Sequence, residues 1–400
     1  MPRLSAALDR IQPSQTLAMT ARVADLQRQG VDVIGLSAGE PDFDTPDFVK
    51  EAAIAAIRAG RTKYTQVDGT PELKAAIAAK FRRDNGLDFA PSQISVNVGG
   101  KHTIFNAIVA TCEAGDEVVI PAPYWVSYPD IVAYAGATPV VIAAGADQDY
   151  KITPDQLDRA ITPRTRWVLL NSPSNPSGAA YSAAELTALG DVLRRHPHVM
   201  LLSDDMYEHI FYADFAFVTM AQLCPDLADR ILTVNGCSKA YAMTGWRIGF
   251  AGGPEWLIKA MGKLQSQSTS NPCSIAQAAA AAALSGPQDF LAERQAAFRA
   301  RRDMVVAMLN DAPGLRCPVP DGAFYVYPDA SGLIGRQTPD GRRIENDDDV
   351  IGYFLDHARV AAVAGAAFGL SPAFRVSYAT SDAVLRDACG RIQQACAALR

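Results

Sequence analysis

Residues 230–252, RILTVNGCSKAYAMTGWRIGFAG, combine two apolar runs with one lysine that stands out between them. The runs 231–235 and 248–252 are typical of buried strands. Lys239 follows the first run among small and apolar neighbours, where its ammonium group would lose much of its hydration, and desolvation lowers the pKa of an ammonium. Arg247 stands eight residues further on. This stretch therefore predicts a lysine at the carboxyl end of a buried strand, with an arginine in reach of the same region.

Similar apolar runs recur before this stretch and alternate with amphipathic segments. Thr70, Pro71 and Glu72 form a helix start, and Ser182–Glu185 has the spacing of a capping box. Near-continuous apolar strands alternating with helices predict an α/β fold, with a mostly parallel sheet covered by helices on both faces. The remaining strand candidates are ISVNV (94–98), DEVVIP (116–121), TPVVIA (138–143), RWVLLN (166–171) and HVMLLSDD (198–205).

Four hundred residues exceed the size at which one hydrophobic core stops growing, so we expect two domains. A long helical pattern over 287–310 leads out of the large domain. It is followed by GAFYVYPD (322–329), VAAVAGAAFG (360–369), FRVSYAT (374–380) and a C-terminal helix, which indicate a smaller α+β domain. The acidic run ENDDDV (345–350) is expected to be a solvated helix start. The predicted boundaries are an N-terminal arm of 1–14, a small domain of 15–46 and 296–400, and a large domain of 47–295.

Composition restricts the kinds of partner that we expect. The chain is 49% hydrophobic and 20% charged, and 37 basic against 43 acidic residues give a net charge of −6. This balance, without a basic tail, argues against nucleic acid and anionic membranes. The N-terminus shows no signal-peptide pattern, and the apolar runs are too short to span a bilayer. Seven scattered cysteines without a CxxC pair favour a reducing compartment, with neither disulfides nor zinc, so we expect a cytoplasmic protein.

Polar residues gather where the predicted strands end. Gly99, Asn171, Asp204 and Lys239 each stand at or just past the carboxyl end of a strand, which is where sheets of this type bind ligands. An isolated lysine at a strand end most often places its ammonium in water. A dry lysine with a lowered pKa is instead a nucleophile for Schiff-base formation with a carbonyl. Arg247 could then bind an anion such as a phosphate.

Asp204 and Asp205 follow a buried strand, and successive side chains of a strand point to opposite faces. One of the two can therefore face a ligand, and a buried carboxylate beside a ring nitrogen keeps that nitrogen protonated, as pyridoxal phosphate chemistry requires. A metal site is the competing interpretation. We favour no metal, because adjacent aspartates on a strand cannot both reach one ion from one face. The metal alternative would use Asp204, Asp205, Glu208 and His209, with His196 and His198.

The segment VNVGGKHTIFNAI (96–108) has a glycine turn between a strand and a helix. Backbone N–H groups at such a helix start are an anion site. The segment is not a Walker A loop, because Ser95 stands where that pattern needs glycine and His102 where it needs serine or threonine.

Three further residues each allow a structural and a functional interpretation. Trp125, in PAPYWVSYP (121–129), belongs either to the core or against a flat ring. NSPSNPSG (171–178) is a polar turn that could present Asn175 as a donor, and its two X-Pro bonds leave cis and trans open. Arg375 lies on an apolar strand, and its partner is either a structural acid or a substrate carboxylate.

Taken together, these motifs resemble the class I pyridoxal-phosphate aminotransferases of fold type I. The likeness is greatest to the bacterial aspartate aminotransferase and prephenate aminotransferase branch, which carries GGK before its first main helix. It covers nearly the whole chain. The motifs that carry it, in the family's order, are SAGEPDFDTP (37–46), KYTQVDGTPEL (63–73), PYWVSYP (123–129), NSPSNPSG (171–178), SDDMYEH (203–209), SKAYAMTGWRIG (238–249) and FRVSYAT (374–380).

The resemblance implies a role for each candidate residue. Lys239 would bind pyridoxal 5'-phosphate covalently and move the proton, and Asp204 would partner the pyridinium. Tyr64 would reach the phosphate of a neighbouring subunit, which implies a homodimer with shared sites. For the other cofactor contacts, the resemblance implies Tyr207 and Asn175 at the phenolic oxygen, Trp125 against the ring, and Gly99, Gly100, Lys101, Ser238 and Arg247 at the phosphate. For the substrate, it implies Arg375 and Gly39 at the α-carboxylate, with Lys101, Trp125 and Asn175 nearby.

The chain departs from the family's pattern at three places. Gly236 stands where some relatives have a further phosphate-binding serine, and Asp205 replaces a commoner glutamate. The stretch 263–277 lacks the arginine with which one branch reads the distal carboxylate, so the resemblance gives that task to Lys101.

The implied reaction moves the amino group of aspartate or glutamate to a 2-oxo acid by a ping-pong route. The alternatives are prephenate as the acceptor, a β-elimination lyase on the same scaffold, and a ligand-sensing regulator. A regulator would need a basic DNA-binding module, and the domain pattern begins almost at the N-terminus.

Overall fold

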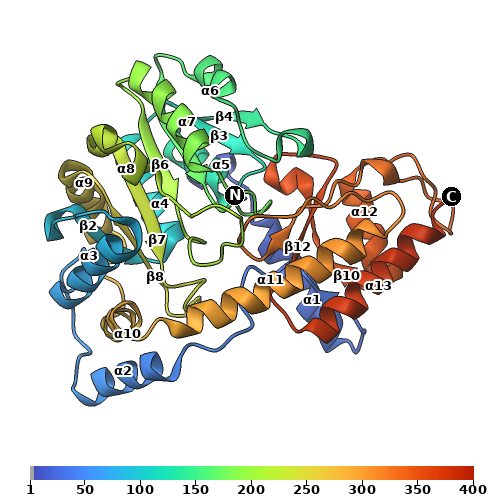
Figure 1. Ribbon diagram of the computed structural model, residues 1–400, viewed down its shortest axis with the longest axis horizontal. Coiled ribbons are helices and arrows are strands. Elements are labelled where there is room, and N and C mark those ends of the chain that lie inside the picture. Colours follow the sequence, from blue (N-terminus) through green and yellow to red (C-terminus); the bar gives the residue numbers. More distant parts are fainter. Residues whose placement is uncertain (1–3) are drawn as a thin grey trace.

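The computed structural model describes residues 4–400, and a sheet of seven strands forms the centre of its larger part (Figure 1). The strand order is β2-β8-β7-β6-β5-β3-β4, and β8 runs in the opposite direction to the other six strands of this sheet. The predicted mostly parallel α/β sheet is therefore confirmed. The strands are β2 Ile94–Val98, β3 Glu117–Ala122, β4 Thr138–Ala143, β5 Thr165–Asn171, β6 Met200–Asp204, β7 Ile231–Gly236 and β8 Ile248–Gly252.

Helices cover both faces of this sheet because its strands are apolar on both sides. Val118 and Ile120 pack on one side with α4, α5 and α9, whereas Val119 packs on the other side with α6, α7 and α8. The helices of the first face are α4 Gly100–Thr111, α5 Ser127–Ala135 and α9 Glu255–Ser266, and those of the second are α6 Pro154–Ala160, α7 Ala183–Arg195 and α8 Met220–Leu223.

A third group of helices packs beyond β2 and β8. It consists of α2 Asp47–Arg58, α3 Pro71–Asn85 and α10 Ser274–Ser285. Both predicted helix starts are present: the Thr70 hydroxyl accepts a hydrogen bond from the Leu73 amide at 3.3 Å, and Ser182 and Glu185 form a capping box. No helix within residues 4–400 has the length and hydropathy needed to span a bilayer.

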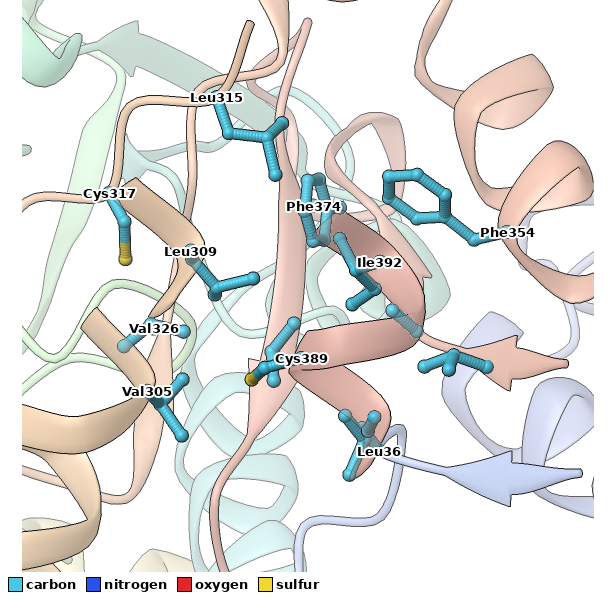
Figure 2. Packing of buried hydrophobic residues seen from close by; sticks show 14 of the residues in the cluster. Leu36, Val305, Leu309, Leu315, Cys317, Val326, Phe354, Phe374, Cys389 and Ile392 are labelled. Carbon is cyan, nitrogen blue, oxygen red and sulfur yellow. The ribbon is translucent and has the colours of Figure 1, made fainter. Parts of the chain in front are cut away.

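The remainder of the chain forms a second body around two small sheets. The long helix α11 (Asp289–Asn310) leads from α10 to this body and packs against α13 (Asp382–Ala398) (Figure 1). Figure 2 shows its apolar core, in which Val305 and Leu309 of α11 lie beside Cys389 and Ile392 of α13. Its other elements are α1 Gln15–Arg28, β1 Ile34–Gly35, β9 Tyr325–Val326, α12 Asp347–Tyr353, β10 Val360–Ala361, β11 Val363–Ala364 and β12 Phe374–Ser377.

Residues from both ends of the chain meet in this second body. β1 pairs in parallel with β10, so residues 34–35 join a sheet with residues 360–361. The domain boundaries given above (1–14, 15–46 with 296–400, and 47–295) stay a prediction.

The acidic run at 345–350 requires a correction. It does start a helix, since the Asn346 side chain caps α12 by accepting from the Asp349 amide at 3.0 Å. Asp347, however, is only 2% exposed, and its carboxylate accepts from the Ala366 amide and the Ser371 hydroxyl, both at 2.8 Å. The prediction of a solvated run was therefore wrong for Asp347, because a distant turn folds back over it.

Candidate active site

A cavity of about 370 Å³ lies at the carboxyl ends of the sheet strands and reaches into the second body. Arg247 arrives at the same edge because it precedes β8, the strand of opposite direction. Gly99 adjoins the cavity as the residue before α4. The predicted residues that line this cavity are Gly39, Gly100, Lys101, Trp125, Asn175, Asp204, Tyr207, Ser238, Lys239, Arg247 and Arg375.

Lys239 is half-buried three residues past the end of β7. Its ammonium group donates to the carbonyl of Gly39 and lies 5.8 Å from the centre of the Phe324 ring. Burial lowers the pKa of Lys239 to about 8, and the positive charges of Arg375 and Arg247 act in the same direction. With a pKa of about 8, roughly a tenth of the amine is neutral at pH 7. The predicted lysine with a lowered pKa is therefore present, and its neutral fraction makes it a nucleophilic amine.

This pKa predicts how the apoprotein captures an aldehyde. The rate of capture of pyridoxal phosphate at limiting reagent should rise about tenfold from pH 6 to pH 7, because only the neutral amine attacks and its fraction grows tenfold per pH unit below the pKa. The rise should level off above pH 8. Stopped-flow absorbance measures this rate, with pyridoxal as a second aldehyde to separate amine ionisation from phosphate ionisation. A rate that still rises tenfold between pH 9 and 10 would contradict the lowered pKa.

Asp204 is buried at the end of β6. Burial raises its pKa to about 6, while the hydrogen bond from Tyr128, at 2.6 Å, and the charge of Lys239 oppose the rise. A cationic partner in the cavity would therefore strengthen the ionised form of this carboxyl. Asp205 does not line the cavity: it accepts from the Ser203 hydroxyl at 2.7 Å and is buried behind the strand. The prediction that the two aspartates face opposite sides is confirmed.

The glycine turn before α4 brings together several groups that favour a bound anion. Gly99 has a φ of +84°, a backbone conformation that favours glycine, and the guanidinium of Arg247 lies against this turn. Gly100 and Lys101 are the first residues of α4, whose N–H groups have no acceptor inside the helix. Burial and the charge of Arg247 lower the pKa of Lys101. Two cationic side chains and a helix N-terminus converge here, and this combination favours a bound anion.

Aromatic and amide side chains form the remaining walls. Trp125 is half-buried and meets Tyr128 edge-on, with ring centres 5.4 Å apart, and the Lys101 ammonium lies 5.1 Å from the centre of the Trp125 ring. The Tyr207 hydroxyl lies 3.0 Å from that of Tyr325. The backbone amide of Asn175 donates to the side chain of Asn171 at 2.7 Å, and both X-Pro bonds of this turn are cis.

Arg375 is 2% exposed, which makes it the most deeply buried arginine facing the cavity. It donates to the Asn175 side-chain oxygen at 2.9 Å and to the Ser37 carbonyl at 2.6 Å, while its Nε atom has no hydrogen-bond partner. Within residues 4–400 it forms no salt bridge. The alternative of a structural acid is therefore not realised, and the guanidinium keeps binding capacity for a carboxylate ligand.

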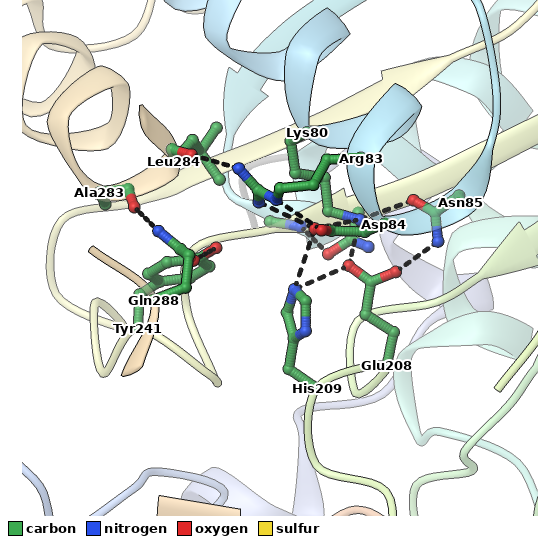
Figure 3. A network of polar contacts seen from close by, with 12 residues as sticks. Lys80, Arg83, Asp84, Asn85, Glu208, His209, Tyr241, Ala283, Leu284 and Gln288 are labelled. Carbon is green, nitrogen blue, oxygen red and sulfur yellow. Dashed lines mark hydrogen bonds and ion pairs between the residues drawn. The ribbon is translucent and has the colours of Figure 1, made fainter. Parts of the chain in front are cut away.

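The residues of the metal alternative do not form one cluster. His196 bonds to Asp158 at 2.8 Å, and His198 bonds to the Thr162 carbonyl at 3.0 Å. Glu208 and His209 instead join Asp84, away from Asp204, in the network that Figure 3 shows.

Lys80 and Arg83 of α3 both supply positive charge to this network, Arg83 through its ion pair with Asp84 at 2.6 Å. Lys80 forms an ion pair with Glu208 and donates to the Asn85 side chain at 2.7 Å, and Asn85 in turn donates to Glu208 at 2.8 Å. Burial raises the pKa of Glu208, but Lys80 and His209 lower it further than burial raises it. A lysine ammonium among the carboxylates takes the place that a cation would need.

Replacing Lys80 with methionine should destabilise the protein by about 3–5 kcal/mol, because it leaves the carboxylate of Glu208 buried without its ion-pair partner. Urea denaturation measures the free energy of unfolding. The double variant Lys80→Met/Glu208→Met removes both charges and should recover much of the loss. A double variant as unstable as Lys80→Met would show that packing, and not the unpaired charge, sets the cost.

Some residues of the cavity were not among the predicted ones. Tyr325 lines the cavity and contacts Tyr207, whereas Tyr128 lies outside the lining and donates to Asp204. Neither differs in sequence from an ordinary core aromatic residue. Thr16 and Leu17 come from α1, at the other end of the chain from the residues they face. Tyr64, which was predicted to reach the phosphate of a neighbouring subunit, does not line this chain's own cavity and is 90% exposed.

Comparisons with known proteins agree with this geometry. A family model described as aminotransferase class I and II matches residues 31–392. The aspartate/prephenate aminotransferase of Cereibacter sphaeroides is 62% identical, with 100% of both chains covered. The aspartate aminotransferase of Rhizobium meliloti is 60% identical over 96% of this chain and 93% of its own.

Two solved structures share the fold. The crystal structure of the aspartate aminotransferase from Rhizobium meliloti has a TM-score of 0.97 at 57% identity, with both chains fully covered. The aspartate aminotransferase of Thermus thermophilus with maleate has a TM-score of 0.92 at 42% identity, over 99% of this chain and 100% of that one.

A mostly parallel sheet with an amine and an anion site at its carboxyl edge, together with these neighbours, defines a fold type I transferase. The chain belongs to the class I and II aminotransferases, and its reaction is transamination. The resemblance stated from the motifs is thereby confirmed.

Proposed function

We propose that this aminotransferase uses pyridoxal 5'-phosphate to move the amino group between L-aspartate or L-glutamate and a 2-oxo acid, 2-oxoglutarate or oxaloacetate. The observation that carries the proposal is Arg375: a buried guanidinium without an acidic partner, in the same cavity as the amine of Lys239. A substrate α-carboxylate would supply the missing partner. The relatives named as aspartate aminotransferases support the choice of substrate.

The donors of the cavity fit this cofactor. The amine of Lys239 suits its aldehyde, and the glycine turn with Arg247 suits its phosphate. Asp204 suits the pyridine nitrogen, because its carboxyl is buried and has a raised pKa. A protonated ring nitrogen beside it would stabilise the ionised carboxylate. When bound, pyridoxal phosphate supplies the electron sink that transamination requires.

The other predicted residues would position the cofactor and move the proton. Trp125, Tyr207 and Asn175 line the cavity. Trp125 would stack against the cofactor ring, and the Tyr207 hydroxyl and the Asn175 amide would hold the phenolic oxygen. Ser238 adds a hydroxyl beside the helix N-terminus at the phosphate end. Lys239 would carry the proton between substrate carbon and cofactor, since a group with a pKa near 8 both accepts and releases protons readily near neutral pH.

Lys101 is the proposed contact for the distal carboxylate of a dicarboxylic substrate. Replacing it with alanine should lower kcat/KM for aspartate about 30-fold and leave the value for an apolar amino acid within about threefold, because only aspartate presents a charge there. Steady-state kinetics with both substrates measure the difference. Lys259→Ala, at an exposed position of α9, is the matched control. Equal losses on both substrates would show that Lys101 does not read the distal carboxylate.

Prephenate is a second candidate for the acceptor. The Cereibacter sphaeroides relative is named for both aspartate and prephenate. In this chain Lys101 and Leu17 both line the cavity, and Leu17 is 66% exposed. A lysine imposes less geometry on an anion than an arginine does. Comparing kcat/KM for prephenate and oxaloacetate, with glutamate as the amino donor for both, tests which acceptor the site prefers.

A homodimer with shared sites is part of the proposal. Tyr64 is 90% exposed, and Ile57 and Ile54 of the adjoining helix α2 are 53% and 37% exposed, so this part of the chain carries large apolar side chains without cover. Burying such side chains favours association. Sedimentation equilibrium should give twice the chain mass; a single-chain mass at micromolar concentration would reject the dimer. Cytoplasmic location also stays a proposal, supported by seven free cysteines, of which six are buried.

A further inference from the structure

The segment between α2 and α3 is irregular in backbone but firmly held. Residues 61–70 contain neither helix nor strand, and they carry the exposed Tyr64. Backbone and side-chain groups of such a segment need partners from elsewhere when they are covered. Two glutamines, Gln265 and Gln277, both 0% exposed, provide them.

Gln277, on α10, joins the middle of this segment to its C-terminal end. Its side-chain oxygen accepts from the Thr70 amide at 2.8 Å, and its nitrogen donates to the Thr65 hydroxyl and the Pro272 carbonyl, both at 2.9 Å. These bonds use both side-chain N–H groups of the amide. Apart from the Pro272 carbonyl, all of them go to the Tyr64 segment, and none goes to an element that lines the cavity.

Gln265, on α9, joins the same segment to the phosphate end of the cavity. Its nitrogen donates to the carbonyls of Val67 at 2.5 Å and Val96 at 2.8 Å. Its oxygen accepts from Asn97 at 2.6 Å and Asn106 at 3.1 Å. Asn97 lies on β2 and Asn106 on α4, the two elements that the Gly99 turn connects.

The C-terminal part of the segment, at Asp68 and Gly69, packs against β2. The Val96 amide donates to the Asp68 carbonyl at 3.0 Å, and Asp68 pairs with Lys74 at 2.5 Å. Gly69 has a φ of +111°, and a Cβ atom there would lie 2.4 Å from a methyl group of Val96. The segment can therefore shift little while both glutamines keep their bonds. An exposed loop whose position is fixed by so many contacts indicates that its position matters for function. Tyr64 is the side chain that this loop holds outward.

We propose that Gln265 and Gln277 are positioning residues that hold Tyr64 for the cofactor phosphate of the other subunit. The inference rests on the homodimer proposed above. Apart from the Pro272 carbonyl, Gln277 bonds only to the Tyr64 segment. It therefore affects the cofactor site of the other subunit. Gln265 affects both cofactor sites of the dimer. It affects the site of the partner subunit through Tyr64, and the site of its own chain through the Gly99 turn.

Mixed dimers separate these effects. Two differently tagged chains are coexpressed, one with Lys239→Ala and one with Lys239 intact, so that only one site shows the absorption of lysine-bound cofactor. Gln277→Leu is placed either on the Lys239→Ala chain, opposite the reporting site, or on the same chain as Lys239. The dissociation constant of pyridoxal phosphate is measured at the reporting site, and pyridoxal, which lacks the phosphate, is measured beside it.

Gln277→Leu should weaken pyridoxal phosphate about tenfold when it lies opposite the reporting site and less than twofold when it lies on the same chain, since one bond to a charged phosphate is disturbed. The affinity for pyridoxal should not change in either arrangement. Gln265→Leu should weaken pyridoxal phosphate in both arrangements. Gln277→Glu keeps the acceptor for Thr70 but loses the donor to Thr65, and it serves as the second variant if leucine prevents folding.

Equal losses in the two Gln277 arrangements, or equal losses for pyridoxal and its phosphate, would overturn the positioning role and leave a general effect on folding. No loss in either arrangement would also overturn it. Tyr64→Phe opposite the reporting site distinguishes this failure from that of the proposed dimer. If Tyr64→Phe weakens the phosphate compound while Gln277→Leu does not, the glutamine inference alone is wrong. If Tyr64→Phe has no effect, the shared site itself is wrong.

Discussion

Lys239→Ala should lower kcat for aspartate on the order of 10⁵-fold, since removal of a covalent nucleophile that also moves the proton eliminates two functions at once. The geometry supports both functions: the amine lies in the cavity, donates to the Gly39 carbonyl and has a pKa of about 8. Single-turnover experiments with excess enzyme, after pyridoxal phosphate is supplied, measure the loss. The purified variant should also lack the visible absorption of lysine-bound cofactor that the parent shows.

The control for this result is Lys263→Ala, at an exposed position of α9, which should keep the parent's rate. Thermal denaturation of both variants checks that the fold is intact. Transamination by Lys239→Ala within 100-fold of the parent would show that another group performs the proton transfer. A parent protein that stays colourless after pyridoxal phosphate is supplied would reject the cofactor assignment altogether.

Arg375→Met should lower kcat/KM for aspartate by roughly 10³-fold, with most of the change in KM, because a fully desolvated carboxylate loses its two-pronged partner. The free energy of unfolding should change by no more than about 2 kcal/mol. The lost hydrogen bonds to Ser37 and Asn175 cost stability, whereas removing a buried charge that has no acidic partner restores part of it. Steady-state kinetics and urea denaturation measure the two quantities on the same preparation.

Arg375→Lys provides the sharper comparison. It keeps the positive charge but cannot form two parallel hydrogen bonds to one carboxylate, so kcat/KM should still fall about 30-fold or more. If Arg375→Lys matches the parent, charge alone suffices and the two-pronged geometry has no role. If Arg375→Met unfolds the protein while Arg375→Lys does not, the positive charge at this position, and not the guanidinium as such, is needed for the fold.

Much of the fold followed from local signals. Apolar runs such as 231–235 and 166–171 form strands because a strand buried on both faces needs an unbroken apolar sequence. Their end residues meet at one edge because parallel strands place their carboxyl ends together, and this brought Asp204 and Lys239 into one cavity. Chain order and residue type were sufficient for that inference.

Other features depended on partners that are far away in sequence. Tyr128 reaches Asp204 across 76 positions, and Tyr325 reaches Tyr207 across 118. Asp347 was expected to be solvated because an acidic helix start usually is, yet a turn from residues 366–371 covers it. No local pattern marks these pairs, since each residue taken alone is equally compatible with the core or the surface.

The sequence by itself determined the α/β class, the order of the strands and helices, and the convergence of strand-end residues such as Asp204 and Lys239, because hydrophobic periodicity and glycine turns act over a few residues. Only the tertiary structure decided that Arg375 has no acidic partner, that Lys80 neutralises Glu208, and that buried glutamines hold the Tyr64 segment. Whether a buried polar group is satisfied depends on which distant atoms the packing brings within about 3 Å of it, and that distance is a property of the folded chain alone.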